Sequence, residues 1–182
     1  MRPGSKRALL LAGAVAAALA LGAAACGEEE ETTVVEGEPL ELGELHFNVQ
    51  LTRFLNPGDT EDSEYLGGQP APSPGQDYLA VFMDVENEGD DEKQLPAFAE
   101  VEVEDTTGAT AEPVESESLF ALQLGESIPA GGEIPEEDSA ASSGPVQGAF
   151  LLFLVPEAVT ENRPLELKIS SGGDEGTIEL DL

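Results

Sequence analysis

Two short, uninterrupted apolar runs constrain the fold of this chain more than any other feature of its sequence. One extends from Tyr78 to Met83, and the other from Ala149 to Val155, where Pro156 ends it. The second run is bounded by glycine and proline and is far too short for a membrane helix, which needs about 20 apolar residues. A strand with two apolar faces suits the middle of a sheet. The two runs therefore predict two central, buried β-strands.

Most of the other regular segments alternate apolar and polar residues, which is the period of a strand with one buried face. The alternation covers Leu45–Leu51, Ala99–Glu104, Leu165–Ile169 and Ile178–Leu182, and a short strand is expected near Ala109–Glu112. Leu40 and Leu42 are even-numbered, whereas the apolar residues of Leu45–Leu51 are odd-numbered, so one continuous strand would place them on opposite faces. Gly43 therefore predicts a bulge or a break between two strands. The acidic exposed faces of these strands oppose edge-to-edge aggregation.

Glycine, proline and acidic residues separate these segments at short intervals. They predict a long loop at 56–77, turns at 87–91 and 128–132, a mobile loop at 136–144 and a hairpin loop at 171–176. Residues 114–142 follow no clear period. Seven or eight strands without a long amphipathic helix predict an all-β domain, an antiparallel β-sandwich, over residues 39–182.

The first 26 residues have the parts of a bacterial export signal. Arg2, Lys6 and Arg7 precede an alanine-rich apolar run over residues 8–25 that ends at Cys26. The block Leu21-Gly-Ala-Ala-Ala-Cys26 resembles the lipobox of bacterial lipoproteins, although alanine stands where leucine is usual, three residues before the cysteine. The resemblance implies a lipoprotein signal peptide over residues 1–25 and a diacylglyceryl group on Cys26. Two acyl chains suffice for stable attachment to a membrane.

Two other outcomes remain open for this region. Ala23-Ala24-Ala25 also satisfies the Ala-x-Ala rule of ordinary signal peptidase, which would release a soluble secreted protein. Alternatively, the apolar run stays uncut as a membrane anchor, because it is just long enough to span a bilayer. Four glutamates at 28–31 argue against a buried structural role for Cys26, and a single cysteine excludes a disulfide within the chain.

Acidic residues dominate the charge of the chain, which has 38 of them against seven basic residues. All the acidic residues follow Cys26 and three of the basic ones precede it, so the mature chain has a formal charge of −34. Such a charge argues against nucleic acid and anionic lipid head groups as partners. It favours cations or basic proteins as partners. Alternatively, the charge simply provides solubility or reflects adaptation to high salt. Residues 26–38 predict an acidic flexible tether, which like charges keep extended.

Four segments together suggest a family. They are Tyr78–Gly89 with its Asn-x-Gly turn, Phe98–Gly108 ending in Asp-x-x-Gly, Ile128–Gly132 with Pro-Ala-Gly-Gly, and Gly148–Pro156. Their order resembles a widespread domain of unknown function in bacterial lipoproteins, also described as telomeric-repeat-binding-factor-like and related to a small secreted antigen. The resemblance covers roughly residues 40–182 and implies an immunoglobulin-like β-sandwich. It brings no catalytic residues, and this chain departs from the pattern in its acidity and its long 56–77 loop.

Few residues are candidates for chemistry. His46 is the only histidine and lies on the polar face of its predicted strand, and without a partner histidine or cysteine it cannot form a zinc site. No serine lies in a Gly-x-Ser-x-Gly motif, and no phosphate-binding glycine loop is present. Asp59, Glu61, Asp62 and Glu64 could supply oxygens for calcium, although their spacing differs from that of an EF-hand. A solvated acidic loop is the simpler interpretation.

The sequence therefore predicts a protein of the cell membrane, anchored by lipid on Cys26 at the extracytoplasmic face. Its sandwich is expected to be a non-enzymatic module that binds an unknown protein or small ligand, without cofactor or catalytic residues. An envelope protein whose acidic domain provides charge and spacing is the alternative, followed by a calcium-binding surface domain. A hydrolase with loop carboxylates would need two carboxylates paired in a cleft.

Overall fold

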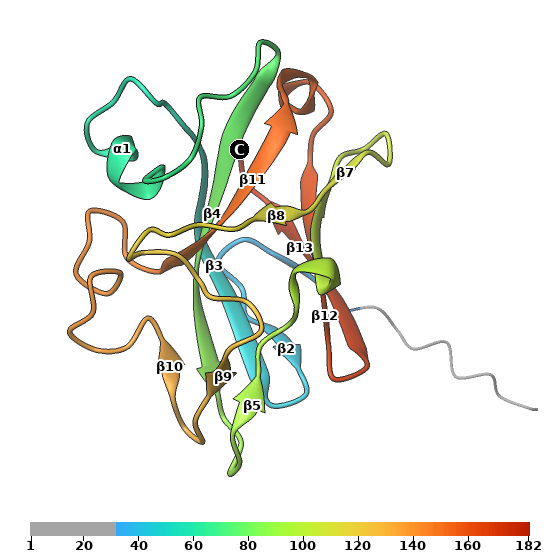
Figure 1. Cartoon of the computed structure of the whole chain (residues 1–182). Helices are drawn as coiled ribbons and strands as arrows, with labels where there is room; N and C mark the ends of the chain where they lie inside the picture. Colours follow the sequence, from blue (N-terminus) through green and yellow to red (C-terminus); the bar gives the residue numbers. More distant parts are fainter. Residues whose placement is uncertain (1–31) are drawn as a thin grey trace, which may run out of the picture.

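Two packed β-sheets organise the computed structural model, which describes residues 32–182 (Figure 1). The first sheet has the strand order β1 (Thr32–Val35), β13 (Asp174–Leu180), β12 (Leu165–Ser171), β6 (Val101–Glu104) and β7 (Thr110–Ala111). The second has the order β2 (Leu40–Leu42), β3 (Leu45–Leu55), β4 (Gln76–Asn87), β11 (Ala149–Pro156) and β8 (Pro113–Val114). In addition, β10 (Glu133–Ile134) pairs with β4, and β5 (Lys93–Gln94) pairs with β9 (Ser127–Ile128).

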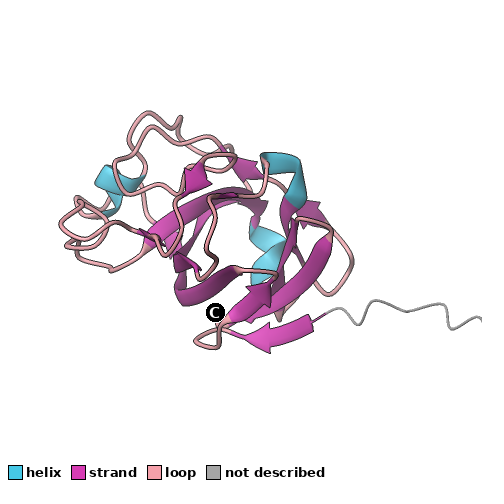
Figure 2. Ribbon diagram, turned by 90° about the horizontal axis from the view of Figure 1, so that it is seen from below, coloured by secondary structure: helices cyan, strands magenta, loops and turns pink. Residues whose placement is uncertain are grey.

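Helical structure in the described part is limited to single turns: α1 (Asp62–Tyr65), η1 (Phe98–Glu100) and η2 (Glu157–Thr160). No helix within residues 32–182 is long and apolar enough to cross a membrane. Figure 2 shows the strands of the two sheets as facing layers, with loops gathered at one side. The prediction of an all-β, antiparallel sandwich is confirmed, with the exception that β1 pairs with β13 in parallel. Eight of the described strands have three residues or more.

The two continuous apolar runs are the adjacent central strands β4 and β11. They pair antiparallel over their whole shared length, from Ala149 opposite Met83 to Pro156 opposite Gln76. One face of this pair packs against the first sheet and forms the main core. That core includes Leu79, Val81, Met83, Leu151 and Phe153 from these strands and Leu167 and Ile178 from the first sheet. Burial of this apolar surface at roughly 25 cal/mol per Å² is the main stabilising contribution.

The other face of β4 and β11 is also covered, which explains why both runs are apolar throughout. Phe82 and Phe150 pack there with Tyr65 of α1, whose ring centroid lies 5.2 Å and 5.5 Å from theirs. Phe120, from the segment before β9, lies 5.1 Å from the same Tyr65 ring. We call this second set of buried residues the outer cluster; it comprises Leu55, Tyr65, Leu66, Tyr78, Ala80, Phe82, Phe150 and Leu152. The predicted 56–77 loop therefore contains a helical turn and covers the sheet.

A β-bulge in β3 turns that strand toward the outer cluster. The register with β4 shifts between Val49 and Leu51, so Gln50 is the extra residue. The strict alternation expected over Leu45–Leu51 consequently ends at Val49, and Leu51 packs against the outer cluster instead of the main core. One extra residue exchanges the faces of all residues that follow it. The bulge therefore decides that Leu55 belongs to the outer cluster.

The folded domain begins earlier than the predicted boundary at Pro39. β1 pairs in parallel with β13, with Thr32 opposite Gly176 and Val35 opposite Glu179. The Glu36 carboxylate accepts hydrogen bonds from the backbone N–H groups of Thr52 and Asp181, at 3.1 Å and 3.0 Å. Residues 32–38 are therefore part of the sandwich and not of the tether. The predicted signal peptide 1–25, Cys26 and the first part of the tether lie outside the described residues.

Both cores and all the sheet pairings above lie within residues 32–182. A chain of this length is of ordinary single-domain size and can bury a core of its own. Residues 32–182 therefore have the size and the buried cores of a single domain.

Candidate functional site

The four carboxylates proposed for calcium do not converge. Asp62 is buried, with one oxygen 2.6 Å from Nη2 of Arg53 and the other accepting the Asn56 N–H at 2.7 Å. Asp59 accepts the N–H of Glu61 at 2.9 Å, which is a local turn hydrogen bond. Within residues 32–182 no group of three or more histidine, cysteine, aspartate or glutamate side chains is arranged to hold a metal ion. Asp62 instead fixes the loop to the sheet.

Arg53 is the partner that gives Asp62 this role. Its guanidinium lies 5.8 Å from the ring centroids of both Tyr65 and Phe82, at the edge of the outer cluster. A cation over aromatic faces is attracted by their negative potential, and a nearby carboxylate balances its charge. The Arg53–Asp62 ion pair therefore joins β3 to α1. This arrangement is structural, and it uses one of the few cations of the chain.

His46 lies on β3, partly exposed, as its place on the polar face predicted. Its Nδ1 is 3.5 Å from a carboxylate oxygen of Glu88, and Glu86 lies opposite it on β4. Near this position, Asp84 contributes to a small cleft of about 250 Å³ with Glu86 and Glu133. Burial raises the pKa of Asp84; a hydrogen bond from Gln50 lowers it, and the charges of Glu86 and Glu133 raise it further.

The turn motifs that suggested a family meet in space. Asn87 is buried, and its side-chain amide donates to the carbonyls of Ile128 and Pro129, each at 3.0 Å, and to that of Asp91 at 2.9 Å. The Asn-x-Gly turn thereby holds the Pro-Ala-Gly-Gly turn, which lies about 40 residues further along the chain. At Gly132 a Cβ atom would lie 2.9 Å from the Pro129 carbonyl oxygen, so this close turn requires glycine.

The Asp-x-x-Gly motif is a second tied turn. Asp105 accepts hydrogen bonds from the Thr107 N–H and hydroxyl at 2.8 Å and 2.6 Å, and from the Asn162 side chain at 3.0 Å. Hydrogen bonds from Thr107 and then Asn162 are the main causes that lower the pKa of Asp105 to about 2. They join the β6–β7 turn to the connection between β11 and β12. The motifs therefore specify the fold.

A cleft with an apolar floor lies beside β9 and β10. We call it the groove, and it has a volume of about 610 Å³. Its walls come from the 119–123 segment, the β9–β10 connection and the 135–141 segment, and the start of β11 closes it. Ile128, Ala141 and Ala149 contribute buried side chains, while Leu119 lines the groove with 84% of its surface exposed. Four glutamates also line it: Glu126, Glu133, Glu136 and Glu137.

Hydrogen bonds hold the β9–β10 wall of the groove to the sandwich and stabilise the 135–141 wall from within its own loop. Asn87 fixes the β9–β10 connection at Ile128 and Pro129, as described above, while β9 pairs with β5 and β10 with β4. On the opposite wall the Ser139 carbonyl accepts the hydroxyls of Ser142 and Ser143 at 3.0 Å and 2.9 Å. Asp138 has a left-handed backbone with φ of 66° at the outer end of this wall. Residues 139–143 of the expected 136–144 loop therefore form a hydrogen-bonded turn.

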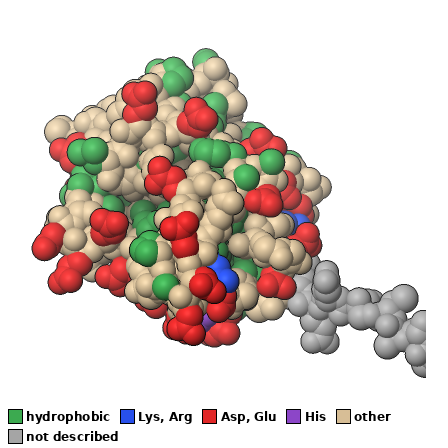
Figure 3. Space-filling view, turned by 60° about the horizontal axis from the view of Figure 1, so that its bottom comes forward, with side chains coloured by type: hydrophobic (Ala, Val, Ile, Leu, Met, Phe, Trp, Pro, Cys, Tyr) green, Lys and Arg blue, Asp and Glu red, His purple; other side chains and the backbone are tan. Residues whose placement is uncertain are grey.

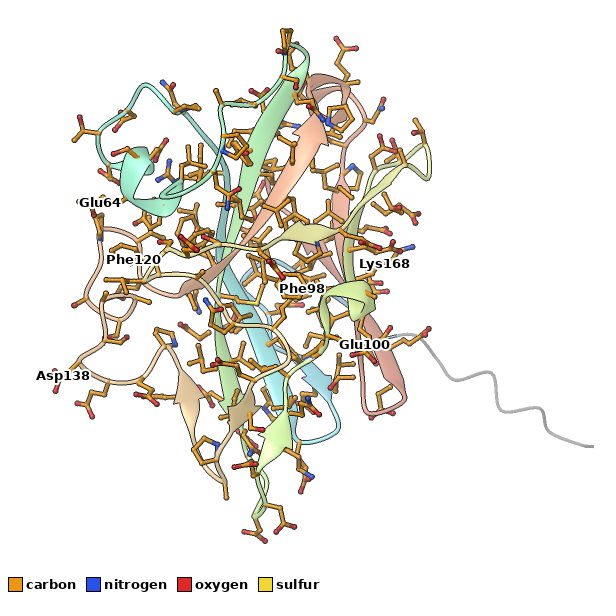
Figure 4. The ribbon with its side chains drawn as sticks, in the orientation of Figure 1. Glu64, Phe98, Glu100, Phe120, Asp138 and Lys168 are labelled. Atoms are coloured by element: carbon orange, nitrogen blue, oxygen red, sulfur yellow. The ribbon has the colours of Figure 1, made fainter. Side chains whose placement is uncertain are left out.

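The figures show where the loops around the groove lie. In Figure 4, Asp138 and Phe120 lie on the side of the loops, and Glu100 and Lys168 lie on the side of the first sheet. Figure 3 shows acidic side chains scattered over the face that carries the lower loops, with apolar side chains exposed between them. The groove could not be predicted from the sequence, because residues 114–142 show no regular alternation of apolar and polar residues. The one sequence feature that could have indicated it is that leucine, isoleucine and proline residues alternate irregularly with glutamates in this region.

A second cleft, of about 550 Å³, opens at the end of the sandwich between the β2–β3 and β12–β13 turns. Lys93 forms an ion pair with Glu44 there, and Glu100 and Asp174 also line it. The hydrogen bond with Glu44 raises the pKa of Lys93. This cleft lacks the exposed apolar side chain of the groove, and its cation is already paired.

Solved bacterial structures are similar to this chain. An uncharacterized β-sandwich protein from Clostridium difficile aligns with 85% of this chain and 97% of its own, at 16% identity and TM-score 0.51. The yjhA protein from Bacillus subtilis aligns over 82% and 99%, at 15% identity and TM-score 0.50. The secreted protein MPT63 from Mycobacterium tuberculosis aligns over 82% and 97%, at 13% identity and TM-score 0.51.

No protein-family model matches the chain, and no curated protein is significantly similar to it. At the identities of the similar structures, likeness is a statement about fold and not about activity. The chain is therefore a β-sandwich protein with the fold of these bacterial proteins.

Proposed function

We propose that this chain is a lipid-anchored extracytoplasmic protein whose sandwich is a non-enzymatic binding module, with the groove as its binding surface. One observation carries the proposal: an open groove of about 610 Å³ combines an exposed leucine with a wall, the β9–β10 connection, that Asn87 fixes to the sandwich. Ligand sites are typically concave, mostly apolar and about 300–1,000 Å³ in volume. The groove has these properties, and its β9–β10 wall does not have to be ordered when a ligand binds.

The location rests on the N-terminal sequence. Cys26 follows a basic start and an apolar run, and a diacylglyceryl group there supplies two acyl chains. The mature domain is too acidic to adsorb on an anionic membrane, so attachment depends on the lipid. The similar MPT63 structure is that of a secreted protein, which agrees with export.

The anchor is tested with Cys26→Ser in cells that express the full chain. We expect the processed, membrane-bound form to disappear, with the protein either released or left uncut. Fractionation into membrane and soluble parts, with the size of the band on a gel, distinguishes these states. A processed Cys26→Ser chain that stays in the membrane fraction would show that lipid on Cys26 is not the anchor.

The binding role is tested with residues 32–182 as a labelled probe on envelope preparations. We expect saturable binding that Leu119→Ser together with Ile134→Ser reduces, because both side chains line the groove. Val35→Ser is the matched control, since Val35 is the other large exposed apolar residue of the described part, at 47% exposure. Binding that never saturates, or that both changes reduce equally, would favour the alternative, an envelope protein that provides only charge and spacing.

A further inference from the structure

We propose that the groove binds a basic peptide segment of a partner protein, one in which arginine or lysine residues flank apolar side chains. This inference rests on the proposed role of the groove as the binding surface and names the chemistry of its partner. It follows from three properties: the charge of the rim, the apolar floor and the use of the chain's own cations elsewhere.

The rim of the groove, which we define as Glu126, Glu133, Glu136 and Glu137, carries negative charge that no basic residue in the described part neutralises. Glu126, Glu136 and Glu137 are exposed, and within residues 32–182 none of them forms an ion pair or a hydrogen bond through its side chain. Glu133 lies directly opposite Glu86 on β4, and like charges at such positions repel each other. A ligand cation in the groove would relieve this repulsion.

The chain's own basic residues are already engaged. Arg53 pairs with Asp62, Lys93 with Glu44 and Lys168 with Glu104, while Arg163 donates to the carbonyl of Leu182. These four are the basic residues of the mature chain. None of them lines the groove. The complementary charge must therefore come from a partner.

The apolar floor of the groove indicates that the ligand has apolar side chains in addition to positive charge. A simple cation would need only carboxylates, whereas this groove also presents Leu119 almost fully exposed beside Ile128 and Ile134. An apolar side chain gains about 25 cal/mol for each Å² of apolar surface that it buries, so leucine-like residues of a ligand would be retained there. Arginine suits the rim because its planar guanidinium can bind a carboxylate through two parallel hydrogen bonds.

Other macromolecules fit the groove less well. Nucleic acids and anionic membranes carry the same charge as the rim and would be repelled by it. The volume of about 610 Å³ exceeds what one side chain fills, and the groove is open, which suits several residues of a chain. A basic, partly apolar peptide segment satisfies charge, surface and size together.

The test uses residues 32–182 and a short synthetic peptide of alternating arginine and leucine that carries a fluorophore. Binding is followed by fluorescence anisotropy at about 150 mM salt, where long-range attraction is screened beyond roughly 8 Å. Two matched peptides have serine in place of leucine, or glutamate in place of arginine. We expect both replacements to weaken binding at least tenfold.

Protein variants distinguish the groove from the acidic surface in general. The groove variant carries Glu126→Gln, Glu136→Gln and Glu137→Gln, and the control carries Glu161→Gln, Glu175→Gln and Glu179→Gln, which are exposed residues away from the groove. Both variants have the same net charge. The groove variant is expected to bind the peptide about tenfold more weakly, since three ion pairs at a few tenths to one kcal/mol each are lost. The control is expected to change affinity less than about twofold.

Equal losses in the two variants, or binding that is indifferent to leucine, would overturn the proposal, because the peptide would then be held by general charge. Thermal melting of each variant establishes that it is folded. If envelope binding stays saturable and sensitive to Leu119→Ser while the arginine–leucine peptide does not bind, the basic-peptide inference is wrong and the binding role stands. If both fail, the groove is not a binding surface.

Discussion

Replacing Tyr65 with alanine tests whether the outer cluster is a true second core. Tyr65 is 1% exposed and contacts the rings of Phe82, Phe120 and Phe150 at centroid distances of 5.1 to 5.5 Å. An aromatic side chain buries about 150–250 Å², which at about 25 cal/mol per Å² corresponds to about 4–6 kcal/mol as an upper bound. Aromatic-to-alanine changes in cores cost about 3–5 kcal/mol. We expect Tyr65→Ala to lower the free energy of unfolding by about 4 kcal/mol.

The assay is urea unfolding of residues 32–182, followed by far-UV circular dichroism. With a slope of about 2 kcal/mol per molar, the midpoint should fall by about 2 M. Tyr65→Phe keeps the ring and loses only a long hydrogen bond from the Val146 N–H, at 3.4 Å. It should therefore cost less than about 1 kcal/mol. If Tyr65→Ala costs as little as Tyr65→Phe, the loops over the second sheet contribute no packing energy and the reasoning is refuted.

Three other predictions follow from hydrogen bonds and charge. Asn87→Ala should cost about 2–3 kcal/mol in thermal or urea unfolding, because it leaves the buried carbonyl of Ile128 and the partly buried carbonyl of Pro129 without this donor; a neutral result would contradict this role. Asp105 has a pKa lowered to about 2 in the folded state, so its contribution is present above pH ~4 and lost as the pH falls toward 2. Asp105→Asn should therefore flatten the decline in stability over that range, and an unchanged pH profile would count against it. The melting temperature should be higher at about 0.5 M than at about 10 mM salt, because screening reduces self-repulsion of the acidic surface; no gain with salt would remove that argument.

Much of the sandwich could be predicted because strand patterns are local. The runs at Tyr78–Met83 and Ala149–Val155 became the central strands β4 and β11, and the break at Gly43 became the turn of the β2–β3 hairpin. The predicted loop at 171–176 is tighter than expected, since Ser171 already pairs with Asp174 and only Gly172 and Gly173 turn the chain. Both glycines have positive φ, which suits a two-residue hairpin turn.

The groove and the loop anchors could not be predicted, because their contacts join distant parts of the chain. In the sequence, Arg53 resembles an ordinary surface cation and Asp62 a possible calcium ligand. The bulge at Gln50 and the helical turn α1 bring the two side chains together in the structure. The groove is formed by short strands and irregular segments, whose conformation depends on what they pack against more than on their own propensities. Leu119 lies in the 114–142 region, whose sequence lacks a period that would predict its exposure.

The sequence by itself determined the fold class, the two buried central strands and the strongly acidic charge, since each depends on residue type and short-range order. It also supplied the prediction of a lipid on Cys26, which depends on a local signal at the N-terminus. Only the tertiary structure decided that the second sheet is covered on both faces, that β1 joins the first sheet, and that four glutamates surround an apolar groove. These features arise from contacts between residues far apart in the chain, such as Asn87 with Pro129, and they form only when the whole domain has folded.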